Sequence, residues 1–174
     1  MDDDIRNALV PLYPRLRRFA TALTGSVQDA DDLVQQTCER ALSRPSQWRP
    51  GTRLDSWLYR IMHNRWADER RSAWRRTRVP IEEAREEIGE DGEAHALAAL
   101  TLDTVYRELW RLPEEQRVVL ILACVDGLTY KEVAEVLELP IGTVMSRLAR
   151  GRLALAERLE RRTAVPPDNV RKLR

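Results

Sequence analysis

The chain has 174 residues, of which 43% are hydrophobic and 33% are charged, and its formal net charge is +1. This composition is typical of a folded protein and excludes a largely disordered chain. So small a net charge also excludes an argument for nucleic-acid binding from total charge alone. The charge is nevertheless uneven, since residues 1–75 and 105–174 each carry a net +3 and residues 76–104 carry −5.

The N-terminus and the cysteines bear on localisation and cofactors. The first residues, MDDDIRNALV, lack the apolar stretch of a signal peptide, and the apolar run VVLILACV is much too short to cross a membrane. Cys38 and Cys124 lie in apolar helical patterns and make no zinc-binding spacing with His63 and His95. We therefore predict a soluble cytoplasmic protein with buried, reduced thiols and without a metal or other cofactor.

Apolar residues recur with the period of an α-helix along nearly the whole chain, so we predict an all-α fold. Pro11 and Pro14 interrupt the first apolar segment, which predicts a kinked or split helix over residues 5–23. A second helix is expected from about Ser26. After a loop that contains prolines, a third helix is expected over residues 54–74.

The helical pattern fades after residue 76 and resumes near Glu93. A helix that follows Pro113 is expected to stop at Asp126-Gly127. Thr129 and Glu132 then predict a capping box for the next helix, and a last helix is expected over residues 141–161. We predict two small helical domains, an acidic flexible linker between them and a frayed tail, in the order 1–76 (domain), 77–93 (linker), 94–164 (domain) and 165–174 (tail).

The stretch LPIGTVMSRLARGR, residues 139–152, has the pattern of the second helix of a helix-turn-helix. Helical spacing groups Val144 and Leu148 on an apolar face, and it groups hydrogen-bond donors on the opposite face. Arginine can bond guanine in the major groove, and serine or threonine can bond bases or phosphates. The candidate DNA contacts are Thr143, Ser146, Arg147 and Arg150, with Tyr130, Lys131 and Arg152 toward the DNA backbone. The alternative is a helical hairpin with a solvated polar face.

The helix around DADDLVQQTCER has an exposed side of carboxylates and amides, which is unsuited to phosphate. Its members are Asp29, Asp32, Gln35, Gln36, Glu39 and Arg40. Such a face would suit a basic protein partner, but from physics alone simple solvation is the better explanation.

The segment from Trp48 to Arg76 interleaves five aromatic rings with eight arginines. Rings that stack on bases, together with positive charge, are what single-stranded DNA binding requires, although rings such as Trp57 could instead belong to the core. Asn64, Arg65 and Asp68 also continue a line of apolar positions. Such a polar break must be hydrogen-bonded or functional, and an asparagine could read an unpaired base.

Four motifs in this order resemble a bacterial RNA polymerase sigma factor of the extracytoplasmic-function (ECF) group, in the sigma-70 family. They are LYPRLRRFATALTG, DADDLVQQTCERAL, WLYRIMHNRWADERR and LPEEQRVVLILACVDGLTYKEVAEVLELPIGTVMSRLARGR. The chain length also fits this group, which keeps only the domains called σ2 and σ4. The resemblance implies a non-enzymatic transcription initiation factor that acts on the promoters of a stress- or signal-specific regulon, and catalysis would belong to polymerase.

The resemblance also implies partners and residue roles. The expected partners are core RNA polymerase (β′ clamp helices and β flap), promoter DNA (duplex −35 and melted −10) and an inhibitory anti-sigma factor, without membrane insertion or a small-molecule substrate. The residues expected to bind core polymerase are Asp29, Asp32, Gln35, Gln36 and Glu39. The residues expected to recognise the −10 element are Trp48, Arg49, Thr52, Arg53, Arg60, Asn64 and Arg65. The residues expected to recognise the −35 element are Thr143, Met145, Ser146, Arg147 and Arg150, with Tyr130 and Lys131.

Two other functions remain open from the residues alone. A stand-alone helix-turn-helix repressor or activator would bind duplex DNA without polymerase, but it leaves the aromatic–arginine segment and the acidic helix face unexplained. A helical adaptor that binds only proteins leaves Ser146, Arg147 and Arg150 unexplained.

Overall fold

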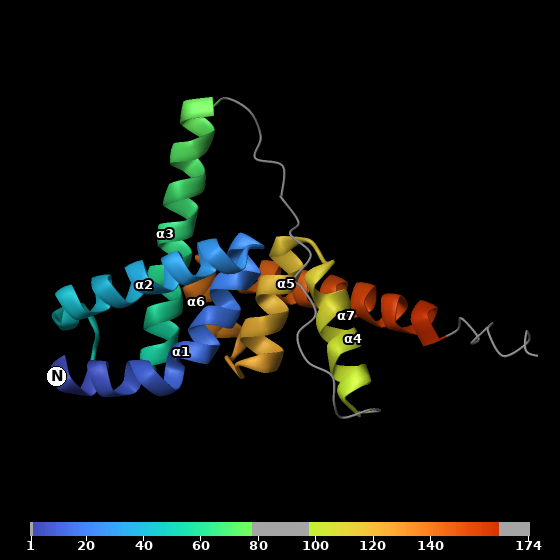
Figure 1. Cartoon of the computed structure of the whole chain (residues 1–174), viewed down its shortest axis with the longest axis horizontal. Coiled ribbons are helices and arrows are strands. Elements are labelled where there is room, and N and C mark those ends of the chain that lie inside the picture. Colours follow the sequence, from blue (N-terminus) through green and yellow to red (C-terminus); the bar gives the residue numbers. More distant parts are fainter. Residues whose placement is uncertain (1, 78–97, 164–174) are drawn as a thin grey trace, which may run out of the picture.

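The computed structural model describes residues 2–77 and 98–163, and every regular element in these two ranges is helical (Figure 1). The elements are α1 Asp2–Thr24, α2 Val27–Ser43, the short 3₁₀ helix η1 Pro45–Gln47, α3 Leu54–Thr77, α4 Ala98–Trp110, α5 Glu114–Leu120, the π-helical turn η2 Ile121–Val125, α6 Tyr130–Leu137 and α7 Ile141–Thr163. The predicted all-α fold is confirmed. The predicted linker, 77–93, lies outside the described residues except for Thr77, which ends α3, and the tail at 165–174 lies wholly outside them.

Helix α1 contains both Pro11 and Pro14 and still runs without interruption, so the helix is not split. Figure 1 shows that its axis turns part of the way along, between the dark blue and the lighter blue portions. Each proline lacks an N–H and its ring crowds the preceding turn, which bends a helix. The kinked form of the prediction is therefore the one observed.

The predicted helix ends agree with local capping chemistry. Helix α2 begins after Ser26, whose hydroxyl accepts a hydrogen bond from the amide of Asp29 at 3.3 Å. Helix α6 begins with the predicted capping box, in which the Thr129 amide donates to Glu132 Oε2 at 2.7 Å and the Glu132 amide donates to Thr129 Oγ1 at 3.3 Å. It ends at Glu138, whose φ of 54° is left-handed and turns the chain toward α7.

The helix expected between Pro113 and Asp126 is interrupted by the π-helical turn η2, which the sequence pattern did not predict. The Asp126 amide donates to the carbonyl of Ile121 at 2.9 Å, five residues back instead of four. A π turn inserts one extra residue and so rotates the residues after it about the helix axis. Asp126 directly follows this turn, and its side chain is buried against α1 and α3.

One contiguous apolar cluster contains side chains from both described ranges. Phe19 of α1 and Tyr59 of α3 form its centre on one side, with ring centroids 4.9 Å apart in an edge-to-face arrangement. Ile121 and Leu122 of η2 are fully buried in the same cluster. Helices α5 and η2 contact α1, and α6 contacts α3, so the N-terminal half (2–77) and the C-terminal half (98–163) pack directly on each other.

The prediction of two buried thiols is wrong for Cys124, which is exposed at the end of η2. The π turn is the physical reason, because it changes which positions of this segment face the core. Cys38 is half-buried, and burial together with the charge of Glu39 raises the pKa of its thiol.

Candidate nucleic-acid interface

The second helix of the helix-turn-helix, α7, sits with one face against the core and the other toward solvent. Val144 and Leu148 are buried, as the spacing predicted, and Val133 of α6 is buried in the same apolar cluster. Ile141, by contrast, is 50% exposed, because it begins the helix beside the turn. The fold thus fixes α7 through its apolar side and leaves the opposite stripe accessible.

Gly151 allows α7 to approach α5 closely, which the sequence pattern did not indicate. A Cβ atom at this position would lie 2.9 Å from Leu120 Cδ1 and 3.3 Å from Gln116 Cβ. Both distances are shorter than ordinary contact, so the backbone of α7 rests directly on α5 at this point. This packing fixes how far the outer face of α7 lies from α5.

Most of the −35 candidates lie on the accessible stripe. Met145 is 52% exposed, and Ser146 and Arg150 are also exposed. The Ser146 hydroxyl donates to the Thr143 carbonyl at 3.0 Å, and Arg150 Nε donates to the Ser146 carbonyl at 3.4 Å. At the adjoining start of α6, Tyr130 and Lys131 are exposed as well. Ser146, Arg150, Tyr130 and Lys131 thus offer exposed hydrogen-bonding groups, as a DNA-contacting helix-turn-helix requires.

Arg147 differs from its neighbours, because its side chain is only 24% exposed and its Nη2 lies 2.9 Å from Glu115 Oε2. Its guanidinium is therefore paired with a carboxylate of α5 in this arrangement. Thr143 is half-buried near the turn. Of the arginines on this stripe, Arg150 is the one that faces solvent most openly.

The −10 candidates divide between a loop and helix α3. In the loop, Arg49 and Thr52 are exposed, and the Thr52 hydroxyl donates to the Arg49 carbonyl at 2.7 Å. Trp48 is half-buried, and its Nε1 is enclosed without a hydrogen-bond acceptor among the described residues. On α3, Arg65 is exposed and donates to Gln36 Oε1 of α2.

The remaining −10 candidates contact the C-terminal half. Arg53 Nη1 donates to the Gly127 carbonyl at 3.3 Å, and Asn64 Nδ2 donates to Glu138 Oε1 at 3.1 Å. Arg60 Nε lies 3.7 Å from the same Glu138 oxygen. The polar break predicted on α3 is therefore hydrogen-bonded at Asn64. Arg65 and Asp68 are exposed and do not continue a buried stripe.

A groove between α2 and α3 brings two predicted sets together. It is lined by Gln36, Glu39, Arg40, Ser43, Gln47, Trp57, Arg60, Ile61, Asn64, Arg65 and Asp68. The set thus includes polymerase-binding candidates from α2 and DNA-binding candidates from α3. The other α2 candidates lie on the same helix outside this lining, and all of them are exposed: Asp29, Asp32 and Gln35. Gln35 Nε2 donates to Glu39 Oε1 at 2.9 Å, which orders part of this face.

The aromatic–arginine segment is used largely for packing. Tyr59 is fully buried and Trp57 packs against the core, as the alternative held for some of these rings. Trp66 Nε1 donates to Glu114 Oε1 at 3.4 Å, and Arg70 lies over its ring with its Cζ 5.8 Å from the centroid. Trp74, at 60% exposure, is the ring of this segment that remains open to solvent.

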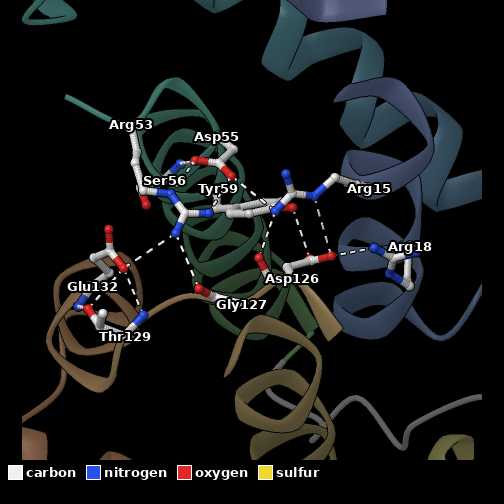
Figure 2. Close-up of polar contacts among 10 residues, drawn as sticks. All are labelled: Arg15, Arg18, Arg53, Asp55, Ser56, Tyr59, Asp126, Gly127, Thr129 and Glu132. Atoms are coloured by element: carbon white, nitrogen blue, oxygen red, sulfur yellow. Dashed lines mark hydrogen bonds and ion pairs between the residues drawn. The ribbon is translucent and has the colours of Figure 1, made fainter. Parts of the chain in front are cut away.

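A buried polar cluster lies between the two halves, and the sequence pattern gave no sign of it (Figure 2). Asp55 and Asp126 are both less than one tenth exposed. Arg15, Arg18, Arg53 and Tyr59 converge on these two carboxylates from α1 and from α3 with the loop before it. Nothing in the local pattern marks these residues, because their partners lie far away in sequence.

Within residues 2–77 and 98–163, no group of three or more His, Cys, Asp or Glu side chains is arranged to hold a metal ion. None of the helices in these two ranges combines the length and the apolar character that a membrane crossing requires.

Comparisons with known proteins agree on one family. The family model described as the Sigma2 domain of PhyR matches residues 9–63, and that described as Sigma-70, region 4 matches residues 102–155. The ECF RNA polymerase sigma factor EcfG of Rhodopseudomonas palustris is 33% identical over 158 residues, which cover 90% of this chain and 85% of the relative. The ECF RNA polymerase sigma factor SigW of Bacillus subtilis is 29% identical over 169 residues, covering 91% and 90%.

Solved structures give the same likeness. The sigma factor RpoE in complex with the anti-sigma factor NepR from Bartonella quintana matches with a TM-score of 0.70 and 29% identity, covering 90% of this chain and 97% of that one. CnrH in complex with the cytosolic domain of CnrY matches with a TM-score of 0.62 at 24% identity, covering 92% and 90%, which supports the fold.

Proposed function

The chain belongs to the extracytoplasmic-function group of RNA polymerase sigma factors, and on this basis we propose that it binds core polymerase, recognises −10 and −35 promoter elements and starts transcription of a signal-specific regulon. The observation that carries the proposal is the pair of polar surfaces, one on α7 and one on α3 with its preceding loop. The assigned parts are residues 1–76 as σ2, 77–93 as linker and 94–164 as σ4.

For the −35 element, we assign base contacts to Ser146 and Arg150, which are exposed on α7. Arg147 joins them once its pair with Glu115 is exchanged for DNA. Thr143 and Met145 flank this set, and Tyr130 and Lys131 contact the sugar–phosphate backbone. The apolar face of Val144 and Leu148 holds the helix in place while the polar face enters the major groove.

For the −10 element, we assign strand opening and base capture to α3 and the loop before it. Asn64 offers an amide that can both donate and accept, which suits an unpaired base edge. Arg53, Arg60 and Arg65 supply positive charge along the strand, with Trp48, Arg49 and Thr52 in the loop. Catalysis of RNA synthesis belongs to polymerase.

For the protein partners, we assign the carboxylates and amides of α2 to core polymerase; all of them are exposed except the half-buried Gln36. Asp29 and Asp32 offer charge to a basic partner, and Gln35, Gln36 and Glu39 extend the same face toward the groove. We also assign an anti-sigma factor as inhibitor, supported by the complexes in which RpoE is bound to NepR and CnrH to CnrY.

Run-off transcription with purified core polymerase tests this function. The template carries a −10 and a −35 element selected by the protein from a random promoter library in the presence of core polymerase. We expect a discrete transcript only when the protein is added, and none when either element is scrambled. Duplex binding without polymerase and without a transcript would support a repressor or activator instead, and polymerase binding without any dependence on promoter sequence would support an adaptor.

A further inference from the structure

We propose that Met145 and Ala149, on an exposed apolar line of α7 that continues to Leu153, recognise the 5-methyl groups of thymines in the −35 element. This inference rests on the proposed function of α7 and deepens it, because it names the base that the middle of the helix recognises. Ser146 and Arg150 offer hydrogen bonds to bases. A thymine methyl group accepts no hydrogen bond, so its recognition requires an apolar side chain.

Helix α7 carries two lines of apolar side chains, and the fold buries one of them. Val144 and Leu148 belong to the core and are 0% and 2% exposed. On the other line, Met145 is 52% exposed, Leu153 is 63% exposed, and Ala149 is exposed between them. The outer face of a surface helix is normally polar, and a contiguous apolar line that stays in solvent marks an interaction site.

This apolar line runs along the middle of the exposed side of α7. Successive residues of a helix turn by about 100°, so side chains four positions apart lie nearly above one another. Ala149 therefore lies between Ser146 and Arg150 on one flank and Arg152 on the other, all of which are exposed. When such a face enters the major groove, its middle reaches the base edges and its flanks reach the walls. The groups that meet the base edges first are therefore apolar.

The charge around the line favours DNA as its occupant. Residues 141–153 of α7 include three arginines and no carboxylate, and the first carboxylate of the helix is Glu157. Phosphates require such positive charge, whereas an apolar line that binds a protein does not. The major groove combines phosphates along its walls with thymine methyl groups at the base edges. It therefore matches both the charge and the apolar centre of this face.

The spacing of the two side chains predicts the spacing of the thymines. Met145 and Ala149 are four residues apart, which is about 6 Å along the helix axis, and stacked base pairs are about 3.4 Å apart. The N-terminal half of a recognition helix is the part that contacts base edges, so these two residues, and not Leu153, are the expected readers. We therefore expect thymine, on either strand, at two positions roughly two base pairs apart.

Exchange of thymine for uracil tests this inference, because uracil lacks the 5-methyl group and keeps the pairing edge. Holoenzyme made from core polymerase and the full-length chain receives two promoter fragments in one tube, with dT or dU at a single −35 position. Filter retention gives the ratio of their affinities. We expect about fourfold weaker binding of the dU fragment at two positions, which equals about 0.8 kcal/mol for one methyl group at 1.4 kcal/mol per tenfold. Uracil in the spacer between the elements should give a ratio of about one.

Two substitutions connect each methyl group to one side chain. Met145→Gln and Ala149→Ser place a polar atom on the line, and each should bring the dT/dU ratio to about one at one position and leave the other position unchanged. A change in folding or helix packing would alter the affinity for both fragments alike and would leave the ratio as it was. Leu102→Ser is the matched control, because Leu102 is an equally exposed apolar residue, at 64%, on α4.

The outcomes separate this inference from the proposed function. A ratio of about one at every −35 thymine, or a ratio that survives both substitutions, would overturn methyl recognition and leave the apolar line to a protein partner. A −35 element selected from the random library without any A·T pair would overturn it as well. Equal retention of fragments with intact and scrambled −35 elements would overturn the proposed function and this inference with it. Ratios that behave as expected, in a holoenzyme that makes no run-off transcript, would overturn only the role in initiation.

Discussion

The Tyr59 hydroxyl in α3 donates a 2.9 Å hydrogen bond to the buried carboxylate of Asp126, 67 residues further along the chain. Burial and the charge of Asp126 both raise the pKa of Tyr59 well above its usual value of 10.0, so the phenol stays protonated and remains a donor. The ring itself packs against Phe19. One side chain thus belongs both to the apolar core and to the polar contact between the two halves.

Tyr59→Phe should therefore lower the free energy of unfolding by roughly 1–3 kcal/mol, because the ring is kept and a hydrogen bond to a charged acceptor is lost. Denaturant unfolding followed by circular dichroism measures this. Tyr13→Phe is the control, since Tyr13 is 46% exposed. Equal stability of the two variants would mean that the Tyr59 hydroxyl contributes nothing net.

Asn64→Ala should impair promoter opening more than polymerase binding, because its amide is assigned to an unpaired base. Fluorescence of a 2-aminopurine in the −10 element reports opening, and gel filtration with core polymerase reports binding. Glu138→Gln is a useful comparison, because it removes the charge beside Asn64 while keeping the asparagine. Equal losses of opening and binding in Asn64→Ala would count against base reading.

Asp32→Arg should weaken binding to core polymerase, because it reverses a charge on the exposed α2 face. A pull-down with immobilised β′ clamp helices measures the affinity. Asp103→Arg changes the charge equally on α4 and serves as the control. If both proteins bind as the unmodified chain does, Asp32 lies outside the contact.

Arg150→Ala should reduce discrimination at one −35 base pair by roughly 1–3 kcal/mol if its guanidinium reads a guanine. Transcription from single-base promoter variants measures the discrimination. Arg147→Ala should show a smaller effect, because that side chain must first give up its 2.9 Å pair with Glu115. A uniform loss across all promoter variants would make Arg150 a backbone contact.

The stability of the protein should fall as the pH decreases through the usual histidine range. Burial lowers the pKa of His63 below 6.5, opposed by its hydrogen bond with Asn64 and the charge of Glu138 and aided by the charge of Arg71. The unfolded chain then takes up a proton near pH 6.5 before the folded protein does. The contribution of neutral His63 to the free energy of unfolding is therefore fully present above pH 6.5. It is lost as the pH falls toward the pKa of His63 in the folded protein.

His63→Gln should remove this part of the pH dependence and leave the carboxylate titrations at lower pH. Denaturant midpoints measured between pH 5 and pH 8 test the difference between the two proteins. Parallel curves over this range would show that His63 titrates alike in the folded and unfolded states.

The helical class, the ends of α2 and α6 and the two faces of α7 could all be predicted from the sequence alone. Each of these depends on residues a few positions apart: Ser26 caps its own helix, Thr129 and Glu132 form one box, and Val144 and Leu148 share one turn. The order of four local motifs was likewise enough to indicate the family, which the comparisons then confirmed.

The contacts of the polar side chains of α1 and α3, by contrast, depend on the tertiary fold. Tyr59, one of the five rings of the aromatic–arginine segment, lies in the core. Arg53, Arg60 and Asn64 contact carbonyl and carboxylate oxygens more than seventy positions away. Asp126 reaches the N-terminal half because a π turn precedes it, and that extra residue leaves no mark in the apolar period. Helical periodicity shows which face of a helix is buried, but it holds no information about the partner across the interface, and those partners decide how Asp126 is bonded.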